Sequence, residues 1–413
     1  MTEPRPGRLF YGWFIVAVAF AANFMATGVG FYVFNAFMKP LCELRGWTRA
    51  DINLGPVIGG AVSLICTLAY GTLVMRTGPR ALMALGAIVS GLAFALLGQA
   101  RTIGQFYLGF ILLFAGNGAL AGIVANTAVN DWFVKKRGRA LGLANIGISL
   151  SGAVLPFAAM LLIERTDLAR AFLWIGAAIA LVAPAAWLVV RDRPEDHGLH
   201  PDGAVGEEAE RLAKIAAAES RAGFWTLSDV VRSATFWKLG VVYALAMAGV
   251  VGVMFQLAPR FEDVGFDSRA AMLMMSVTAL LGALGKYFWG SLCDRFEPRR
   301  VVAALIATTA AGLGLGLVQG SLAALVLFIA VFGFAMGGVV STTPVLIGHF
   351  FGRAAYASVA RVLGRVVRLQ VVGYYLMGRS FKITGSYDAA YAIFIALDLI
   401  AAALVLSIRQ PQG

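Results

Sequence analysis

The sequence predicts an all-α membrane protein with twelve transmembrane helices in two pseudo-symmetric halves of six. Three observations support this prediction: an apolar composition, a regular series of apolar runs and an internal repeat. Sixty per cent of the 413 residues are hydrophobic and 14% are charged, whereas a soluble globular protein has roughly 25% charged residues. Each apolar run is long enough to cross about 30 Å of hydrocarbon. One such run could be a buried soluble helix, but a dozen could not share one soluble core.

The apolar runs form two groups of six, separated by one polar stretch. The predicted spans are residues 10–37, 51–75, 80–99, 103–130, 138–163, 169–190, 236–260, 270–292, 300–319, 321–348, 355–379 and 386–408. We therefore expect an N-terminal six-helix bundle at 1–190, a cytoplasmic linker at 191–232 and a C-terminal six-helix bundle at 233–413. The linker is interpreted as a charged, solvated connector, in which residues 207–221 could form a surface helix.

An internal repeat relates the two groups of spans. The second span is followed by GTLVMRTGPR at 71–80, and the eighth by GSLCDRFEPRR at 290–300, 219 residues later. Small residues let two helices approach closely, and charged residues can pair with one another and with helix ends. We expect both segments to form gating turns. The residues assigned to them are Gly71, Arg76, Arg80, Gly290, Asp294, Arg295 and Arg299.

The basic residues indicate an orientation in the membrane rather than a polyanionic partner. The 34 Lys and Arg exceed the 22 Asp and Glu, but they lie mainly in the connections between spans. With a cytoplasmic N-terminus, about 20 of them fall in cytoplasmic segments and about 10 in the opposite loops, as the positive-inside rule requires. We expect both termini in the cytoplasm, a plasma or bacterial inner membrane location, and no nucleic-acid binding.

Motifs for metal binding and catalysis are missing from the sequence. Cys42, Cys66 and Cys293 are far apart, and the three histidines lack metal-ligand spacing, so neither a disulfide framework nor a metal site is expected. No H-E-x-x-H, G-x-S-x-G or P-loop motif occurs. We expect a monomer that is not an enzyme and has no cofactor. The first apolar run has no cleavage site after a short core, and is interpreted as a span.

Four basic residues fall inside predicted spans: Lys286 in the eighth, and Arg361, Arg365 and Arg368 in the eleventh. An ionised side chain at the bilayer centre costs roughly 2.5–3.5 kcal/mol. Spacings of four and three place the arginines on one helix face. Counted from Arg353, Arg361 lies about 12 Å into the span and can snorkel, whereas Arg365 and Arg368 lie about 18 and 22 Å in.

Acidic partners for these cations are scarce within the predicted spans. Asp398 in the last span is the one plainly embedded acid, and the other candidates lie at span ends. A small anion would compensate the positive charge. The alternatives are snorkelling, pairing with backbone carbonyls, or contact with Asp398 or a helix end. Asn117, Asn126, Tyr32 and Tyr287 are weaker candidate contacts, because polar residues in spans more often join helices.

Short motifs then occur in a characteristic order and spacing. They are YGW at 11–13, WFVKKRGRALG at 132–142, RPEDHGLHPDG at 193–203, FW at 236–237 and TGSY at 384–387. Through them the chain resembles the major facilitator superfamily over nearly its whole length. It is most similar to the branch that holds oxalate/formate antiporters and bacterial relatives of monocarboxylate porters. This resemblance implies a basic residue one turn before the glycine of the eighth-span motif, here Lys286, and another in the eleventh span, here Arg365 or Arg368.

Two departures from the family pattern bear on mechanism. Met75 replaces the acid of the first loop motif, which weakens the gating turn of that half. Animal monocarboxylate porters carry an aspartate where this chain has Gly282, so a proton relay of that kind is in doubt.

The sequence thus predicts a secondary transporter that moves a small mono- or dicarboxylate by alternating access. Exchange is favoured, because an empty positive site resists reorientation through a low-dielectric gate. Proton-coupled monocarboxylate symport remains an alternative, since the substrate could carry the proton. An exporter of amphipathic drugs or metabolites is a second alternative, although such cavities usually carry buried acids. A non-transporting membrane sensor is a third.

Overall fold

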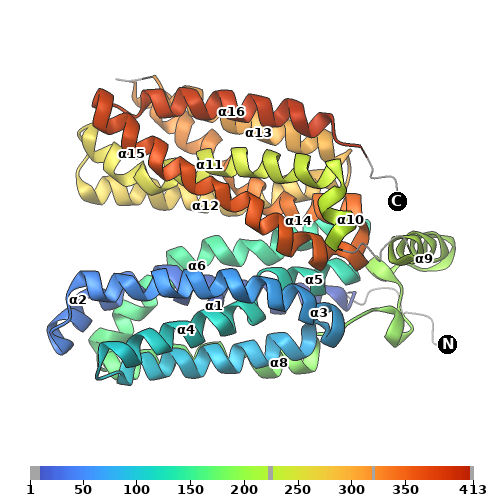
Figure 1. The fold of residues 1–413 in the computed structure, drawn as a ribbon, viewed down its shortest axis with the longest axis horizontal. Helices are drawn as coiled ribbons and strands as arrows, with labels where there is room; N and C mark the ends of the chain where they lie inside the picture. Colours follow the sequence, from blue (N-terminus) through green and yellow to red (C-terminus); the bar gives the residue numbers. More distant parts are fainter. Residues whose placement is uncertain (1–9, 222–226, 319–320, 410–413) are drawn as a thin grey trace. The chain divides into compact units, whose positions relative to one another are not determined.

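The computed structural model describes residues 10–221, 227–318 and 321–409, and these residues form helices and connections without a strand (Figure 1). Ten helical runs are long and apolar enough to cross a membrane. Two of these runs turn back at a glycine of positive φ: Gly78 at φ 74° and Gly352 at φ 77°. Each of the two therefore contains two spans. The expected twelve-span all-α fold is confirmed for the described part of the chain.

The chain divides into two compact units, Met1–Arg221 and Ala222–Gly413, and each is described by itself. The elements of unit 1 are α1 Gly12–Thr27, the π-helix η1 Gly28–Tyr32, α2 Phe34–Arg45, α3 Arg49–Gln99, α4 Ile103–Leu120, α5 Ile123–Trp132, α6 Arg137–Arg165, α7 Leu168–Ala180, α8 Val182–Val189, the 3₁₀ turns η2 Glu195–His197 and η3 Pro201–Gly203, and α9 Gly206–Arg221. The expected surface helix of the linker is thus present as α9.

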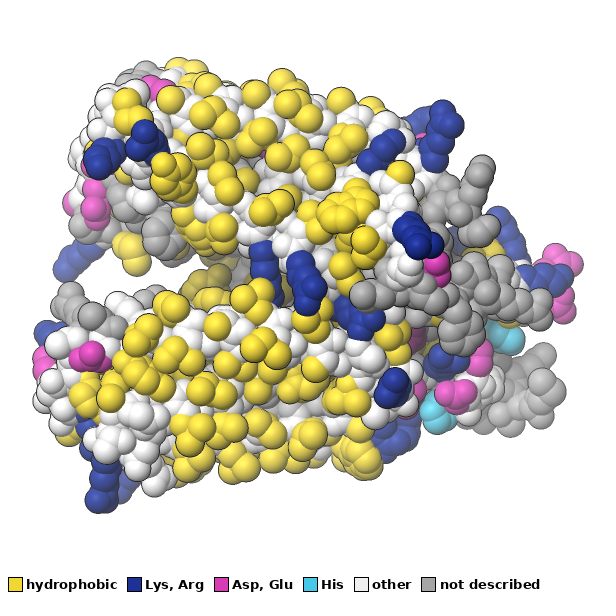
Figure 2. Space-filling view, viewed as in Figure 1, with side chains coloured by type: hydrophobic (Ala, Val, Ile, Leu, Met, Phe, Trp, Pro, Cys, Tyr) yellow, Lys and Arg dark blue, Asp and Glu magenta, His cyan; other side chains and the backbone are white. Residues whose placement is uncertain are grey.

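Unit 2 repeats the six-span plan with different helix breaks. Its elements are α10 Leu227–Arg232, α11 Ala234–Asp263, α12 Ser268–Cys293, α13 Pro298–Gly316, α14 Leu322–Val367, the 3₁₀ turn η4 Arg368–Val371, α15 Val372–Thr384 and α16 Asp388–Leu406. On the visible face of each unit, hydrophobic side chains follow the length of the helices (Figure 2). Such a surface suits contact with lipid.

Local sequence explains where several spans begin. Thr48 and Asp51 form a capping box at the start of α3, and Thr102 and Gln105 form one at the start of α4. In each, the second side chain accepts a hydrogen bond from the backbone N–H of the threonine. Asp267 caps α12 by accepting a hydrogen bond from the Ala270 N–H. These side chains satisfy backbone N–H groups that the first helical turn leaves without partners. The spans therefore start where a polar capping residue precedes an apolar run.

Aromatic packing dominates the core of unit 1. The ring of Phe34 in α2 lies 4.6 Å from that of Phe110 in α4. The Phe37 and Phe172 rings are 4.1 Å apart, and Phe94 lies 5.0 Å from Phe172. These contacts join the first, third, fourth and sixth spans through large buried surfaces.

Glycines bring two helices of unit 2 together backbone to backbone. A Cβ at Gly337 would lie 1.8 Å from the Gly282 carbonyl oxygen, and one at Gly285 would lie 1.8 Å from that of Phe334. Helices α12 and α14 therefore touch along small residues, as membrane helices commonly do. This close contact fixes the position of the eighth span relative to the tenth.

Candidate functional site

Lys286 is buried in the middle of the α12–α14 contact. Its residue is 4% exposed, and its backbone carbonyl accepts a hydrogen bond of 3.1 Å from the Ser341 hydroxyl of α14. The neighbouring glycines Gly282 and Gly285 leave no room for α12 to slide against α14. The structure therefore holds this lysine at a fixed level in the bundle. Tyr287, which follows it, is 41% exposed.

The arginine stripe, defined as Arg361, Arg365 and Arg368, lies where the eleventh span loses its α-helical form. Arg361 and Arg365 occupy the last two turns of α14, and Arg368 opens the 3₁₀ turn η4. Arg365 is exposed, and the other two are half-buried. In the described residues, neither Arg365 nor Arg368 makes a hydrogen bond or an ion pair with an acid. A 3₁₀ stretch inside a long helix often marks a functional hinge.

Small and apolar residues of the eleventh span contact α11, the neighbouring helix of the same unit. Val366 and Gly373 contact α11, where they meet Gly240 and Ala248 respectively. At about 100° per residue, Arg365 lies about 100° around the helix from Val366, and the other two arginines lie farther round. Val366 and Gly373 thus belong to the face that packs against α11, and Arg365 lies to one side of it.

Asp398, the one acid embedded in a predicted span, does not neutralise the stripe. It lies in α16 with 0% exposure, and neither carboxyl oxygen has a hydrogen-bond partner in the described part of the chain. The alternative in which Asp398 pairs with an arginine of the eleventh span is therefore wrong for this conformation.

The weaker candidates of unit 1 do not form one group. Asn117 Nδ2 donates to the Ala26 carbonyl at 3.1 Å, while its buried Oδ1 has no partner among the described residues. Asn126 instead accepts a hydrogen bond of 3.3 Å from Asn145. The Tyr32 ring, at the end of η1, lies against Gly152 of α6. Asn126 and Tyr32 therefore contact other helices, as polar side chains in spans commonly do.

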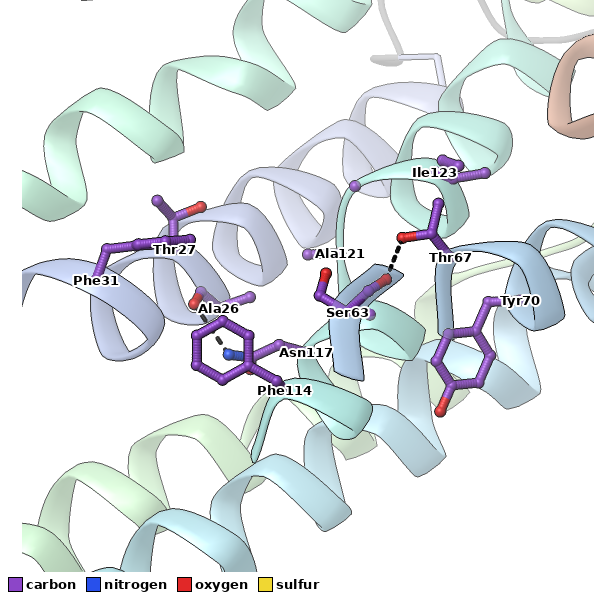
Figure 3. A pocket seen from close by; sticks show the side chains of 12 residues that line it. Ala26, Thr27, Phe31, Ser63, Thr67, Tyr70, Phe114, Asn117, Ala121 and Ile123 are labelled. Atoms are coloured by element: carbon purple, nitrogen blue, oxygen red, sulfur yellow. Dashed lines mark hydrogen bonds between the residues drawn. The ribbon is translucent and has the colours of Figure 1, made fainter. Parts of the chain in front are cut away.

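Asn117 does line a pocket of about 260 Å³ within unit 1. Figure 3 shows it between Phe31 and Phe114 on one side and Ser63 and Thr67 on the other. None of the lining residues carries a charge; the full set is Ala26, Thr27, Phe31, Ser63, Thr67, Tyr70, Phe114, Asn117, Gly118, Ala121, Gly122 and Ile123. The pocket can offer hydrogen bonds and apolar contact, but no charge neutralisation.

The repeated turns hold the last span of each unit. In unit 1, Arg80 Nε donates to the Trp187 carbonyl at 2.7 Å, and its guanidinium lies 4.4 Å from the Trp187 ring centre. In unit 2, the Arg299 guanidinium donates to the Ile408 carbonyl and pairs with Glu297. Hydrogen bonding to Arg299 lowers the pKa of Glu297 below its ordinary value.

The other assigned turn residues differ in their exposure. Gly71 and Gly290 are buried, Arg76 and Arg295 are exposed, and Asp294 stands at the C-terminus of α12. Sequence reasoning missed Glu297, which is the acid that pairs with the arginines of the second turn: Arg299 and, at 3.0 Å, Arg300.

Residues 193 and 195–200 of the expected solvated connector are exposed, but Pro201 and Asp202 are buried against unit 1. Asp202 is 6% exposed, and its carboxylate accepts three backbone hydrogen bonds, from Val134 at 2.9 Å, Lys135 at 2.7 Å and Lys136 at 2.9 Å. It is also the one non-glycine residue of positive φ in the described ranges, at 59°. The sequence signal was the Pro-Asp-Gly turn at 201–203, whose Asp tolerates this conformation.

Comparison with known proteins decides the family. A model described as "Major Facilitator Superfamily" matches residues 10–369 and 239–412. The chain belongs to the major facilitator superfamily. This major facilitator protein is therefore a multi-pass membrane protein and a transporter rather than an enzyme.

Curated relatives match most of the chain. It is 25% identical to rat "Monocarboxylate transporter 13", over 98% of this chain and 90% of that protein. It is 22% identical to the "Oxalate:formate antiporter" of Oxalobacter formigenes, over 86% of this chain and 82% of the relative.

Solved structures share the major facilitator fold. The human organic anion transporter MFSD10 superposes with a TM-score of 0.71 at 17% identity, covering 98% of this chain and 100% of that one. The E. coli fucose:proton symporter gives 0.71 at 15% identity, over 96% and 99%. At such low sequence identities, these two matches establish only the fold.

Proposed function

We propose that this protein is a secondary transporter that moves a small organic anion, a mono- or dicarboxylate, across the membrane by alternating access. The observation that carries the proposal is the pair of arginines, Arg365 and Arg368, at the break of the eleventh span. They have no acidic partner in the described chain, and Arg365 is exposed. Two relatives are named for monocarboxylates and for oxalate and formate.

In the proposed mechanism, charged side chains of unit 2 bind the anion. Lys286 and Arg365 or Arg368 neutralise carboxylate groups, because guanidinium and ammonium groups form strong charge-assisted hydrogen bonds with carboxylates. Transporters commonly place such sites at discontinuous helices near the midplane. Asn117, which lines an uncharged pocket within unit 1, is a weaker candidate contact.

Anion exchange is the proposed mode of transport. An empty site with fixed positive charges must cross a closed, low-dielectric gate to reorient, and burying unpaired charge is costly. A bound anion compensates that charge, so the loaded carrier reorients more readily than the empty one. We propose a monomer in the plasma or bacterial inner membrane, with both termini in the cytoplasm.

Equilibrium binding to purified protein tests the cargo class. A thermal-shift screen against carboxylates of one to six carbons first selects ligands, and isothermal titration then compares wild type with Lys286→Ala. We expect weaker binding of each selected anion by Lys286→Ala. Lys382→Ala, which removes an exposed lysine near the end of α15, is the matched control and should bind normally. Unchanged affinity of Lys286→Ala for every carboxylate would refute the assigned site.

Uptake into liposomes separates transport from sensing. Labelled acetate and oxalate should enter vesicles loaded with unlabelled anion. Binding without any uptake or exchange would favour a non-transporting sensor.

A further inference from the structure

The pocket beside Asn117 has room for a small molecule, and unit 1 alone forms it. Its walls come from the first span, α3 and the fourth span, and its volume is about 260 Å³. A cavity of about 150 Å³ holds one benzene ring, whereas drug-sized ligands occupy pockets of roughly 300–1,000 Å³. A single aromatic ring with one short substituent therefore matches this volume.

Two phenylalanines form an apolar wall of the pocket (Figure 3). The Phe31 and Phe114 rings lie 5.9 Å apart, edge to face, at 78° to each other. The Phe114 ring packs closely against Gly59 of α3, which holds it in place. Phe31 is 65% exposed, which leaves area for another ring to cover. Aromatic rings prefer edge-to-face or offset stacked contacts, so this wall suits a third ring.

Asn117 provides a hydrogen-bond acceptor that the described chain does not use. Its Nδ2 donates to the Ala26 carbonyl at 3.1 Å, and its buried Oδ1 has no partner among the described residues. Turning the planar amide to find Oδ1 another partner would break the bond to Ala26. A buried oxygen without a partner costs free energy, which an added N–H or O–H donor recovers. The arrangement therefore favours a ligand that carries a hydrogen-bond donor.

Hydroxyl groups of α1 and α3 add to this acceptor. Thr67 donates to the Ser63 carbonyl at 2.6 Å, and its oxygen can still accept a hydrogen bond. The hydroxyls of Thr27 and Ser63 make no hydrogen bond to the described part of the chain. Because a hydroxyl can donate as well as accept, a ligand carbonyl or hydroxyl oxygen finds donors here.

The lining excludes both charged and purely apolar ligands. No Lys, Arg, His, Asp or Glu belongs to it, so a buried ion would have no counter-charge, which is far more costly than burying a neutral molecule. A hydrocarbon would leave Asn117 Oδ1 without a donor. A neutral molecule with one ring and one polar group satisfies both limits.

We propose that the pocket of unit 1 is a binding site for a neutral, single-ring aromatic amide or alcohol. Asn117 Oδ1 accepts a hydrogen bond from the N–H or O–H group of the ligand, and the ligand ring packs against Phe31 and Phe114. This site goes beyond the proposed anion transport and does not depend on it, because no charged side chain takes part.

Fluorine NMR of the purified full-length protein tests the site with two probes of similar shape, para-fluorobenzamide and para-fluorotoluene, of which only the amide has a donor. Wild type should bind the amide saturably, above the level of protein-free micelles. Ser63→Phe fills the pocket and should abolish saturable binding of both probes. Ile65→Phe adds the same ring to α3 at a position that is 71% exposed and outside the lining, so it should bind both probes as wild type does.

Asn117→Leu separates recognition from shape. In this variant the affinity for the amide relative to the toluene should fall about two- to tenfold, the worth of one neutral hydrogen bond. Thr72→Val, which removes a hydroxyl of α3 outside the lining, should keep the wild-type ratio. Because the ratio compares two ligands on one protein, it is insensitive to a loss of folded protein in either variant.

Three results would overturn the proposal. The first is a wild type that binds no amide saturably, as expected of a pocket that takes up only water. The second is amide binding that survives Ser63→Phe unchanged, since the probe would then lie elsewhere. The third is an affinity ratio that Asn117→Leu leaves as it is in wild type, because Asn117 would then not recognise the donor.

Discussion

The two units share a framework but differ in their chemistry. Arg80 and Arg299 are 219 residues apart, the offset of the internal repeat, and each guanidinium binds a backbone carbonyl near the end of the last span of its own unit. The candidate ligand-binding groups do not repeat in this way. Unit 2 carries the buried lysine and the arginine stripe, whereas the pocket of unit 1 is lined by uncharged side chains. The repeated fold therefore constrains the turns, and the two helical interiors were free to diverge.

The same contrast appears in the helix breaks. The first span changes to a π-helix at Gly28–Tyr32, and the eleventh changes to a 3₁₀ turn at Arg368–Val371. Gly30 lies inside the π-helical segment. A Cβ added at Gly30 would lie 3.4 Å from Asn117 Nδ2, so the missing side chain lets α4 approach closely. Irregular turns of both kinds are frequent at functional sites. One break accompanies a neutral amide and the other a pair of cations, so substitutions at the two breaks should differ in their effect on anion binding.

The largest expected effect on anion affinity comes from removing positive charge in unit 2. Losing one partner of a desolvated ion pair typically costs about 2–5 kcal/mol, so replacing both candidate arginines, in Arg365→Ala/Arg368→Ala, should weaken oxalate binding by about thirtyfold or more. Asn117→Ala removes a neutral hydrogen-bonding group and should weaken binding by about two- to tenfold. Isothermal titration of both variants measures the difference. Equal losses would contradict the division into a charged and a neutral half.

Much of this architecture could be predicted from sequence, for identifiable reasons. Apolar runs have to be about as long as the membrane is thick, so their lengths alone predict the twelve spans. Lys286 and the arginine stripe were found because charge inside such a run is exceptional. Neutral polar residues give no comparable signal. Asn117 lines a pocket while Asn126 contacts Asn145, and only the fold separates them.

Asp202 shows what sequence reasoning could not find in the linker. Arg191–Asp202 contains charged and turn-forming residues, which are typical of solvated connectors. The structure nevertheless buries Asp202, because its carboxylate satisfies three consecutive backbone N–H groups in the α5–α6 connection. Such a contact joins residues 66–68 positions apart, so no local pattern reveals it. The pairing depends on the way the fifth and sixth spans pack.

An intermediate effect, on thermal stability, is expected from Asp202→Asn. This substitution tests a structural contact that occurs in unit 1. Hydrogen bonds to a charged group are worth about 1.5–3 kcal/mol, and the amide offers one acceptor oxygen in place of two. We expect a lower Tm for the purified protein. Asp196→Asn, at an exposed position of the same segment, should leave Tm unchanged. Equal Tm values for wild type and Asp202→Asn would show that residues 191–204 contribute little to the stability of unit 1.

The smallest expected effect on stability comes from the exposed ion pair between Lys135 and Glu208 of α9. Lys135 Nζ lies 2.6 Å from Glu208 Oε1, and this hydrogen bond lowers the pKa of Glu208 below its ordinary value. A carboxylate with a lowered pKa contributes stability above its ordinary pKa of about 4.3, and the contribution is lost as the pH falls through the lowered value. Helix α9 should therefore loosen in acid, and less so at high salt, where exposed pairs are already screened.

Spin labels on α9 at Lys214 and on the α5–α6 connection can measure this loosening as a broader distance distribution. Glu208→Gln should show the broad distribution at neutral pH and respond little to acid. Glu207→Gln, which alters the preceding acid of α9 and leaves the Lys135–Glu208 pair intact, should behave as wild type does. A distribution that stays narrow in Glu208→Gln would mean that Asp202, which is buried, anchors the segment without help from the exposed pair. Because the surrounding water already solvates both charges, the pair can adjust how tightly α9 docks but cannot replace the buried carboxylate.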